Sequence, residues 1–216
     1  MKKIRMNSEL GLLIAILLLS FGMTFIVKAD FGVSVVQAPA YVLSLAIDKL
    51  SFGMANYLIQ TILLSVLVVI LKKFKLSFII AFFVALLYAV TLDGTMWLFR
   101  NIEVVTLTQR IIAFICGFIP LPFAVGLFFR TNTTLMPYDL FLREVVKEKK
   151  LDLAKAKWVF DLSCLGTALI ISLIAFKKVQ GIGIATVFFA FTIGPILGMV
   201  TKFLDKHFEF KSFFNK

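Results

Sequence analysis

Eight polar side chains could do chemistry because they lie within or beside stretches that are otherwise apolar: Thr24, Asn56, Gln60, Asp93, Asn132, Asp139, Asp161 and Thr192. An ionised carboxylate inside a bilayer costs about 2.5–3.5 kcal/mol, so it normally faces a protein interior or water. Asn56 and Gln60 have the i, i+4 spacing that places two side chains on one face of a helix. These residues are therefore candidates for binding a solute.

We expect the eight residues to form two polar sites, one near each surface of a membrane. The outer site is predicted from Asp93, Gln60, Asn56 and Thr24, and the inner site from Asp161, Thr192, Asn132 and Asp139. The alternative interpretation is that Asp93 and Asp161 are helix-end residues in the headgroup region, hydrogen-bonded to their neighbours.

Other kinds of chemistry have little support in the sequence. Cys116 and Cys164 have no CxxC spacing, and His207 is the only histidine, so we expect no metal, redox or cofactor site. The HExxH and GxSxG motifs are absent from the sequence, and we expect no catalytic residues. Gly181 and Gly183 follow no strand, so they indicate a tight turn between helices rather than a phosphate loop.

The composition explains where the polar residues must lie. Of 216 residues 61% are hydrophobic and 16% are charged, and the mean hydropathy is +1.00. Soluble domains have about 45–50% apolar and about 25% charged residues. The charge-free windows predict an all-α bundle of six membrane-spanning helices at 9–27, 54–71, 76–98, 108–129, 157–176 and 181–203. The first apolar stretch is too long for a usual signal peptide, so we expect it to be retained as a helix.

The basic residues predict the orientation of these helices. With the N-terminus inside, 17 of the 23 lysines and arginines lie on inner segments and 6 on outer ones. This asymmetry predicts that both termini are cytoplasmic (N-in, C-in). The net charge of +11 is therefore interpreted as topology and not as a signal for nucleic acid. The lysine-rich segment 147–157 is expected to contact anionic lipid at the cytoplasmic face.

One apolar stretch does not fit the six-helix pattern. Phe31–Ile47 has no charged residue, yet it follows the first helix too closely to be another span. Pro39 and the polar Ser34 and Gln37 favour a short re-entrant or interfacial helix. Such a segment is tolerated at depth only where protein or water covers its backbone.

The two halves of the chain resemble each other, which predicts a 3+3 repeat with a short helix in each half. Residues 1–103 and 104–216 share a helix, a polar turn, a Pro–Tyr region, a second helix, a Lys–Lys pair and a third helix, at offsets of 98 to 105 residues. Three crossings per repeat would invert the second half relative to the first, as in many secondary transporters. The alternative is a duplication retained for packing alone.

Short motifs in both halves resemble the YczE/YyaS/YitT-type family of bacterial integral membrane proteins. They are Phe31-Gly32-Val33-Ser34, Gln37 to Ser44, Leu50 to Gly53, Leu92-Asp93, Lys157 to Asp161 and Gly181 to Thr186. The chain has Val35 where members often have proline, and Ala185-Thr186 where they often have Gly-Thr. The resemblance implies a multi-pass protein of the bacterial cell membrane and, because that family is functionally uncharacterised, implies no chemistry.

The leading hypothesis is a membrane protein that binds or transports a small solute through a cavity between the two repeats. The first alternative is a substrate-capturing subunit of a larger importer. The second is a non-transporting membrane factor that assists assembly of another protein or binds lipid.

Overall fold

The computed structural model describes residues 4–131 and 135–211 and is predominantly helical. Its elements, in chain order, are β1 (Ile4–Asn7), α1 (Ser8–Ala29), α2 (Ala38–Ala46), α3 (Phe52–Leu71), α4 (Leu76–Leu98), α5 (Leu107–Phe118), α6 (Pro120–Arg130), α7 (Pro137–Lys149), α8 (Leu153–Phe176), α9 (Ile184–His207) and β2 (Phe208–Lys211).

The predicted set of six spans is confirmed. The helices long and apolar enough to cross a membrane are α1, α3, α4, the continuous segment Leu107–Arg130, α8 and α9. That segment is divided at Ile119 into α5 and α6, because Pro120 lacks the amide hydrogen that an uninterrupted helix would use. Helix α8 begins at Leu153, four residues before the predicted start, because Asp152 accepts a hydrogen bond from the Lys155 amide and caps it.

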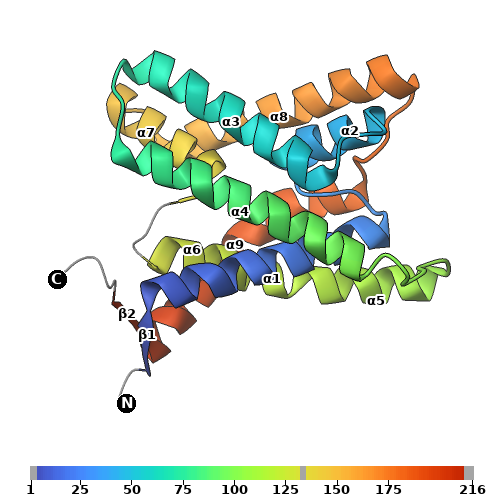
Figure 1. The fold of residues 1–216 in the computed structure, drawn as a ribbon, viewed down its shortest axis with the longest axis horizontal. Coiled ribbons are helices and arrows are strands. Elements are labelled where there is room, and N and C mark those ends of the chain that lie inside the picture. Colours follow the sequence, from blue (N-terminus) through green and yellow to red (C-terminus); the bar gives the residue numbers. More distant parts are fainter. Residues whose placement is uncertain (1–3, 132–134, 212–216) are drawn as a thin grey trace.

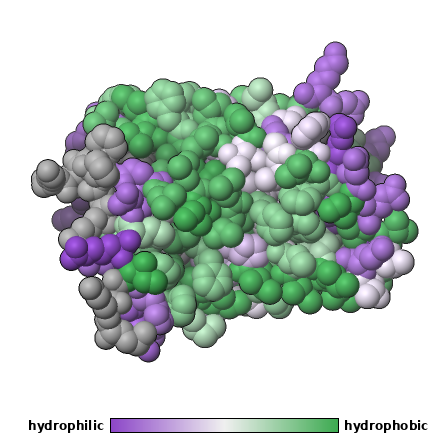
Figure 2. Space-filling view, turned by 60° about the horizontal axis from the view of Figure 1, so that its bottom comes forward, coloured by the Kyte–Doolittle hydropathy of each residue, from purple (hydrophilic) through white to green (hydrophobic). Residues whose placement is uncertain are grey.

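The surface is that of a protein surrounded by lipid. Figure 1 shows β1 and β2, the first and last described elements, at one end of the molecule, which is called the termini end below. Figure 2 shows a broad apolar region between two polar ends. Large apolar side chains such as Val69, Ile174 and Phe191 are 73%, 78% and 76% exposed in the isolated chain. A water-soluble protein rarely exposes apolar surface this extensively, so these side chains face the bilayer.

The short helices α2 and α7 lie between the long ones. The stretch Phe31–Ile47 contains the nine-residue helix α2, which packs on α3 and α8. Helix α7 packs on α3, α8 and α4. In Figure 1 both short helices lie in the upper layer with α3 and α8, whereas α1, α5, α6 and α9 form the lower layer.

The lower layer is held by a close approach of α1 to the α5–α6 segment. A Cβ atom on Gly22 would lie 2.8 Å from the Gly117 carbonyl oxygen, and one on Gly117 would lie 2.7 Å from the Gly22 carbonyl oxygen. Small residues allow membrane helices to pack this closely. The resulting van der Waals contact stabilises the helix pair in lipid, where the hydrophobic effect does not drive helices together. This contact joins the two halves of the chain.

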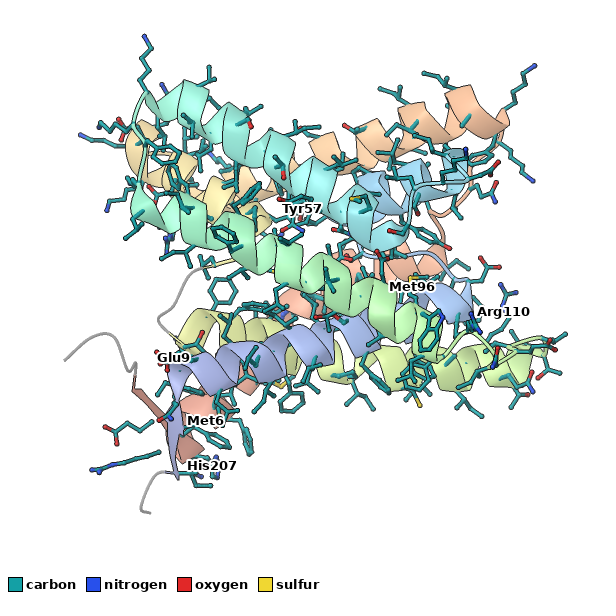
Figure 3. All side chains as sticks on the ribbon, viewed as in Figure 1. Met6, Glu9, Tyr57, Met96, Arg110 and His207 are labelled. Atoms are coloured by element: carbon teal, nitrogen blue, oxygen red, sulfur yellow. The ribbon has the colours of Figure 1, made fainter. Side chains whose placement is uncertain are left out.

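Strand pairing, ion pairs and hydrogen bonds join distant segments at both ends of the molecule. At the termini end, β1 pairs in parallel with β2, and Arg130 binds Asp205 with N and O 2.6 Å apart. At the opposite end, the Arg110 guanidinium binds the Asp30 carboxylate and the Ala29 carbonyl oxygen. Figure 3 shows Arg110 and His207 at these two ends.

Candidate functional site

The site is built on the N-terminal turns of α2 and α7, which begin deep in the bundle. Gln37 immediately precedes α2, and its Oε1 accepts a hydrogen bond of 3.2 Å from the Tyr88 hydroxyl. Tyr88 lies 12 residues beyond the start of α4, which is about 18 Å along the helix and near its middle. From there α2 runs outward to Ala46 at the end opposite the termini.

Helix α7 approaches the same region from the termini end. The Tyr138 hydroxyl donates a 3.1 Å hydrogen bond to Asn56 Oδ1 in the second turn of α3. At its other end, α7 places Glu144 against Lys75 in the turn between α3 and α4. Each short helix has a proline in its first turn, Pro39 or Pro137, where the missing amide hydrogen costs no helical bond.

Two buried amides lie beside the start of α7. Asn56 and Gln60 are fully buried on one face of α3. Gln60 Oε1, Gln60 Nε2 and Asn56 Nδ2 have no hydrogen-bond partner within the described residues. A buried polar group without a partner costs about 1–3 kcal/mol, so an amide pair with three open positions is unusual in a folded core.

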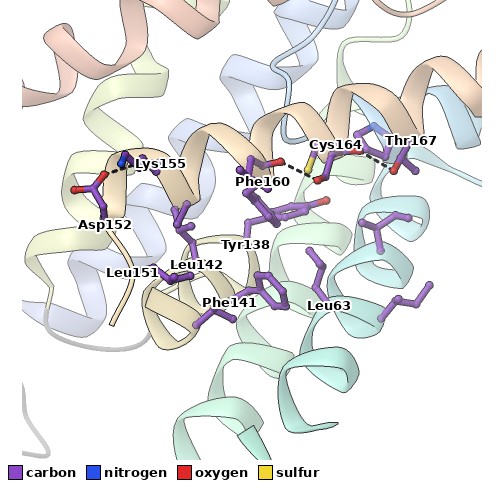
Figure 4. Close-up of a pocket in the computed structure, with 17 residues that line it drawn as sticks. Leu63, Tyr138, Phe141, Leu142, Leu151, Asp152, Lys155, Phe160, Cys164 and Thr167 are labelled. Carbon is purple, nitrogen blue, oxygen red and sulfur yellow. Dashed lines mark hydrogen bonds between the residues drawn. The ribbon is translucent and has the colours of Figure 1, made fainter. Parts of the chain in front are cut away.

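A cavity of about 610 Å³ lies on the side of Tyr138 that faces away from Asn56. It lies between α3, α7 and α8, and Pro39 reaches it from the first turn of α2. Figure 4 shows Tyr138 and Phe141 of α7 between α8 and Leu63 of α3. Tyr138 lines the cavity with its ring and binds Asn56 through its hydroxyl, so it separates the cavity from the buried amides.

Asp93 has a structural partner that explains its position. Its Oδ1 accepts a 2.8 Å hydrogen bond from the Gly53 amide, and its Oδ2 accepts one of 2.5 Å from the Ser51 hydroxyl. Ser51 is the N-cap of α3, so Asp93 on α4 binds the N-terminus of the neighbouring helix. A carboxylate is stabilised there by the free amides and the helix dipole. This arrangement matches the helix-end interpretation of Asp93.

Thr24 is not part of the amide pair. Its hydroxyl donates to the Ser20 carbonyl oxygen over 2.9 Å and lies 2.8 Å from the Thr95 hydroxyl. These bonds join α1 to α4. The four residues predicted for the outer site therefore contact different partners, and only Asn56 and Gln60 share one buried face.

The residues of the predicted inner site are also divided. Lys157 donates 3.0 Å hydrogen bonds to both carboxylate oxygens of Asp161, one turn along α8. Asp139, in the first turn of α7, is close enough to interact electrostatically with both. Burial raises the pKa of the Asp139 carboxyl to about 6, Lys157 opposes the rise and Asp161 adds to it. Helix α7 lies outside the six spans.

Thr192 and Asn132 do not extend this group. Thr192 is half-buried on α9, where its hydroxyl donates to the Phe188 carbonyl oxygen. Helix α9 packs on α6 in the lower layer, whereas α8 packs on α2 and α7. Asn132 lies outside the described residues.

Sequence reasoning did not select Tyr138, Tyr88 or Gln37 as site residues. Gln37 lies two residues before Pro39 and Tyr138 directly follows Pro137, so both lie near the start of a short helix. That placement near Pro39 and Pro137 is the signal that could have identified them. Tyr88 carries no comparable signal, because it lies inside an ordinary apolar span.

Comparison with known proteins gives a family and no chemistry. A family described as a family of unknown function, DUF6198, matches residues 6–202. The chain belongs to this family. No curated protein and no solved structure is significantly similar to it. The resemblance to the YczE/YyaS/YitT-type family receives no support from these comparisons.

Within the described residues, no group of three histidine, cysteine, aspartate or glutamate side chains is placed to hold a metal ion. The expectation that the protein binds no metal ion and no cofactor stays a prediction from the sequence. The chemistry available at the junction of α2, α3 and α7 is hydrogen bonding by amides and hydroxyls.

Proposed function

We propose that this protein binds a small polar solute at the buried amide pair and carries it across the membrane. The observation that carries the proposal is the set of open hydrogen-bond positions on Asn56 and Gln60 beside the first turn of α7. A solute that offers both donors and acceptors would satisfy all three positions. The protein would act without catalysis, as a multi-pass protein of the bacterial plasma membrane with both termini in the cytoplasm.

The arrangement of the short helices supports this role. Helix α2 belongs to the first half of the chain but packs on α8 of the second, and α7 of the second half packs on α3 of the first. Transporters built from inverted repeats commonly hold their solute at such an interface, next to the N-termini of interrupted helices. The reciprocal packing supports an inverted repeat of residues 1–103 and 104–216.

Tyr138 provides a way to open the site. Its ring forms part of the cavity wall while its hydroxyl binds Asn56. Movement of the first turn of α7 would break this bond and expose both amides to the cavity. The pairing of Glu144 with Lys75 holds α7 at the termini end, so α7 would pivot about that contact.

The proposal is tested by a ligand screen on the purified protein in lipid nanodiscs. Amino acids, sugars, nucleosides and short carboxylic acids are tested for an increase in melting temperature. A ligand present at 100 times its Kd should stabilise the protein by about 2.7 kcal/mol. A solute of the proposed kind shifts the wild type and fails to shift Asn56→Leu and Gln60→Met.

Tyr57→Phe is the matched control, because Tyr57 lies on the same helix and its hydroxyl makes no hydrogen bond with the described residues. This variant should keep the full ligand response. Each positive solute is then radiolabelled and its uptake into proteoliposomes is measured. The proposal is refuted if no solute shifts the wild type, or if both amide variants respond as the wild type does.

A further inference from the structure

The cavity between α3, α7 and α8 has the length of one lipid leaflet. It extends along α8 from Lys155 near the termini end to Thr167, a rise of about 18 Å over 12 residues. The hydrocarbon core of a bilayer is about 30 Å thick, so one leaflet contributes about 15 Å. The cavity wall between these positions is mainly aliphatic and aromatic: Ile59, Ile62, Leu63, Phe141, Leu142, Val145, Val159 and Phe160.

One cation and one carboxylate, Lys155 and Asp152, line the cavity at its mouth. Lys155 lines the mouth and is exposed, and its ammonium group has no ion-pair partner among the described side chains. The nearby Asp152 carboxylate accepts a hydrogen bond from the Lys155 backbone amide and so caps α8. Lys157 differs, because it is paired with Asp161. The mouth therefore offers an unpaired cation at the level of the headgroups.

A second cavity lacks the combination of an apolar wall and a lysine at the mouth. It has a volume of about 490 Å³ and lies between α1, α6 and α9. The residues that line it are all apolar and include Met6, Phe123 and Phe203. It offers no cation to a headgroup.

We propose that the cavity between α3, α7 and α8 binds one phospholipid with an anionic headgroup, taken from the leaflet at the termini end. The phosphate binds Lys155, and one acyl chain lies between α3 and α8 as far as Tyr138. This site is separate from the solute site, because the lipid contacts only the cavity face of Tyr138. A bound chain holds that ring against the amide pair.

The first test changes the shape of the cavity. The protein is reconstituted with equal amounts of phosphatidylglycerol and phosphatidylcholine, extracted in mild detergent and analysed by native mass spectrometry. The wild type should retain one phosphatidylglycerol. Val159→Trp fills the cavity from α8 and should retain none, whereas Ile174→Trp, also exposed on the same helix but outside the cavity lining, should retain it. Equal retention by Val159→Trp overturns the proposal.

The second test changes the charge without changing the shape. Lys155→Gln should reduce the preference for phosphatidylglycerol over phosphatidylcholine about fivefold, as expected for one basic residue at a membrane surface. Lys202 is exposed on α9 at the same end, so Lys202→Gln should leave the preference for phosphatidylglycerol unchanged. An unchanged preference in Lys155→Gln contradicts headgroup recognition. A lipid-free dimer of the wild type would show that a second copy of the chain covers the cavity.

Discussion

The Tyr138 hydroxyl donates a 3.1 Å hydrogen bond to Asn56 Oδ1 and so joins the first turn of α7 to the second turn of α3. Both side chains are buried. The two residues are 82 positions apart in the sequence and come from different halves of the chain. This bond connects the position of α7 to the state of the amide pair.

Removal of this hydroxyl should destabilise the protein. Tyr138→Phe leaves Asn56 with no partner in a buried environment, which costs about 1–3 kcal/mol. The melting temperature of the purified protein should fall, while Tyr57→Phe should melt as the wild type does. If the amides are opened by movement of α7, Tyr138→Phe should also bind the solute faster. Equal melting temperatures for the two variants would contradict the role of the bond.

Replacement of Gln60 should have the opposite effect on stability. Gln60→Met keeps a similar length and removes two buried polar atoms that have no partner in the described structure. The free energy of unfolding should rise by about 1–3 kcal/mol while the response to solute is lost. Denaturant titration in detergent measures the first effect and the ligand screen the second. A less stable Gln60→Met protein would indicate that the amide has a structural role.

Asp93 should act on stability and not on solute binding. Asp93→Ala removes both acceptors from the N-terminus of α3 and should cost about 1–3 kcal/mol. Asp93→Asn keeps an oxygen for the Gly53 amide and should lose less. The remaining folded protein should respond to solute as the wild type does. A selective loss of the ligand response in Asp93→Asn would instead place Asp93 in the solute site.

Gly183 should tolerate no side chain. A Cβ atom there would collide with the Phe31 carbonyl oxygen, which already accepts a 2.9 Å hydrogen bond from the Ala185 amide. Gly183→Ala should destabilise the protein by about 1–3 kcal/mol, because backbone cannot move aside as a flexible side chain can. Gly198→Ala, with open space around it, is the control and should be neutral or slightly stabilising. Similar melting temperatures for the two variants would contradict this contact.

The stability of the protein should depend on the protonation of Asp139. Burial raises the pKa of this carboxyl to about 6 from 3.8, with Lys157 opposing and Asp161 adding to the shift. Between these values the folded protein retains a proton that the unfolded chain releases. The contribution of Asp139 to stability is therefore present at low pH and is lost as the pH rises towards and through 6.

The comparison with Asp139→Asn isolates this contribution. The melting temperature of Asp139→Asn relative to the wild type should increase between pH 4 and pH 7, because the variant has no carboxyl to ionise. Titrating groups that do not interact with Asp139 act on both proteins and cancel in the difference. A difference that is constant over this range would show that Asp139 titrates in the folded protein as it does in the unfolded one.

The six spans could be predicted from the sequence because membrane crossing is decided by local properties. A helix that satisfies its own backbone needs only length and apolar side chains to cross lipid, and both are visible in the sequence. The limits of α8 show where this reasoning becomes less accurate. Its charged first turn extends beyond the apolar window because Asp152 caps it.

The role of Asp93 required the tertiary structure. The sequence placed it near the outer end of its helix, where a carboxylate could bind a solute or a neighbouring helix. The choice depends on how α4 packs on α3, which brings the Gly53 amide to 2.8 Å from the carboxylate. A Cβ atom on Gly53 would collide with the backbone of α4 at Ala89, so this packing also requires the glycine.

The candidate site shows the same division. The sequence determined that Asn56 and Gln60 share one face of a membrane helix, because helical periodicity acts over one turn. Only the tertiary structure decided that Tyr138 binds Asn56, that Gln60 is left with open hydrogen-bond positions and that a cavity lies beyond the ring. These features depend on the depth at which α7 enters the bundle. That depth follows from packing between distant segments, which local sequence patterns do not record.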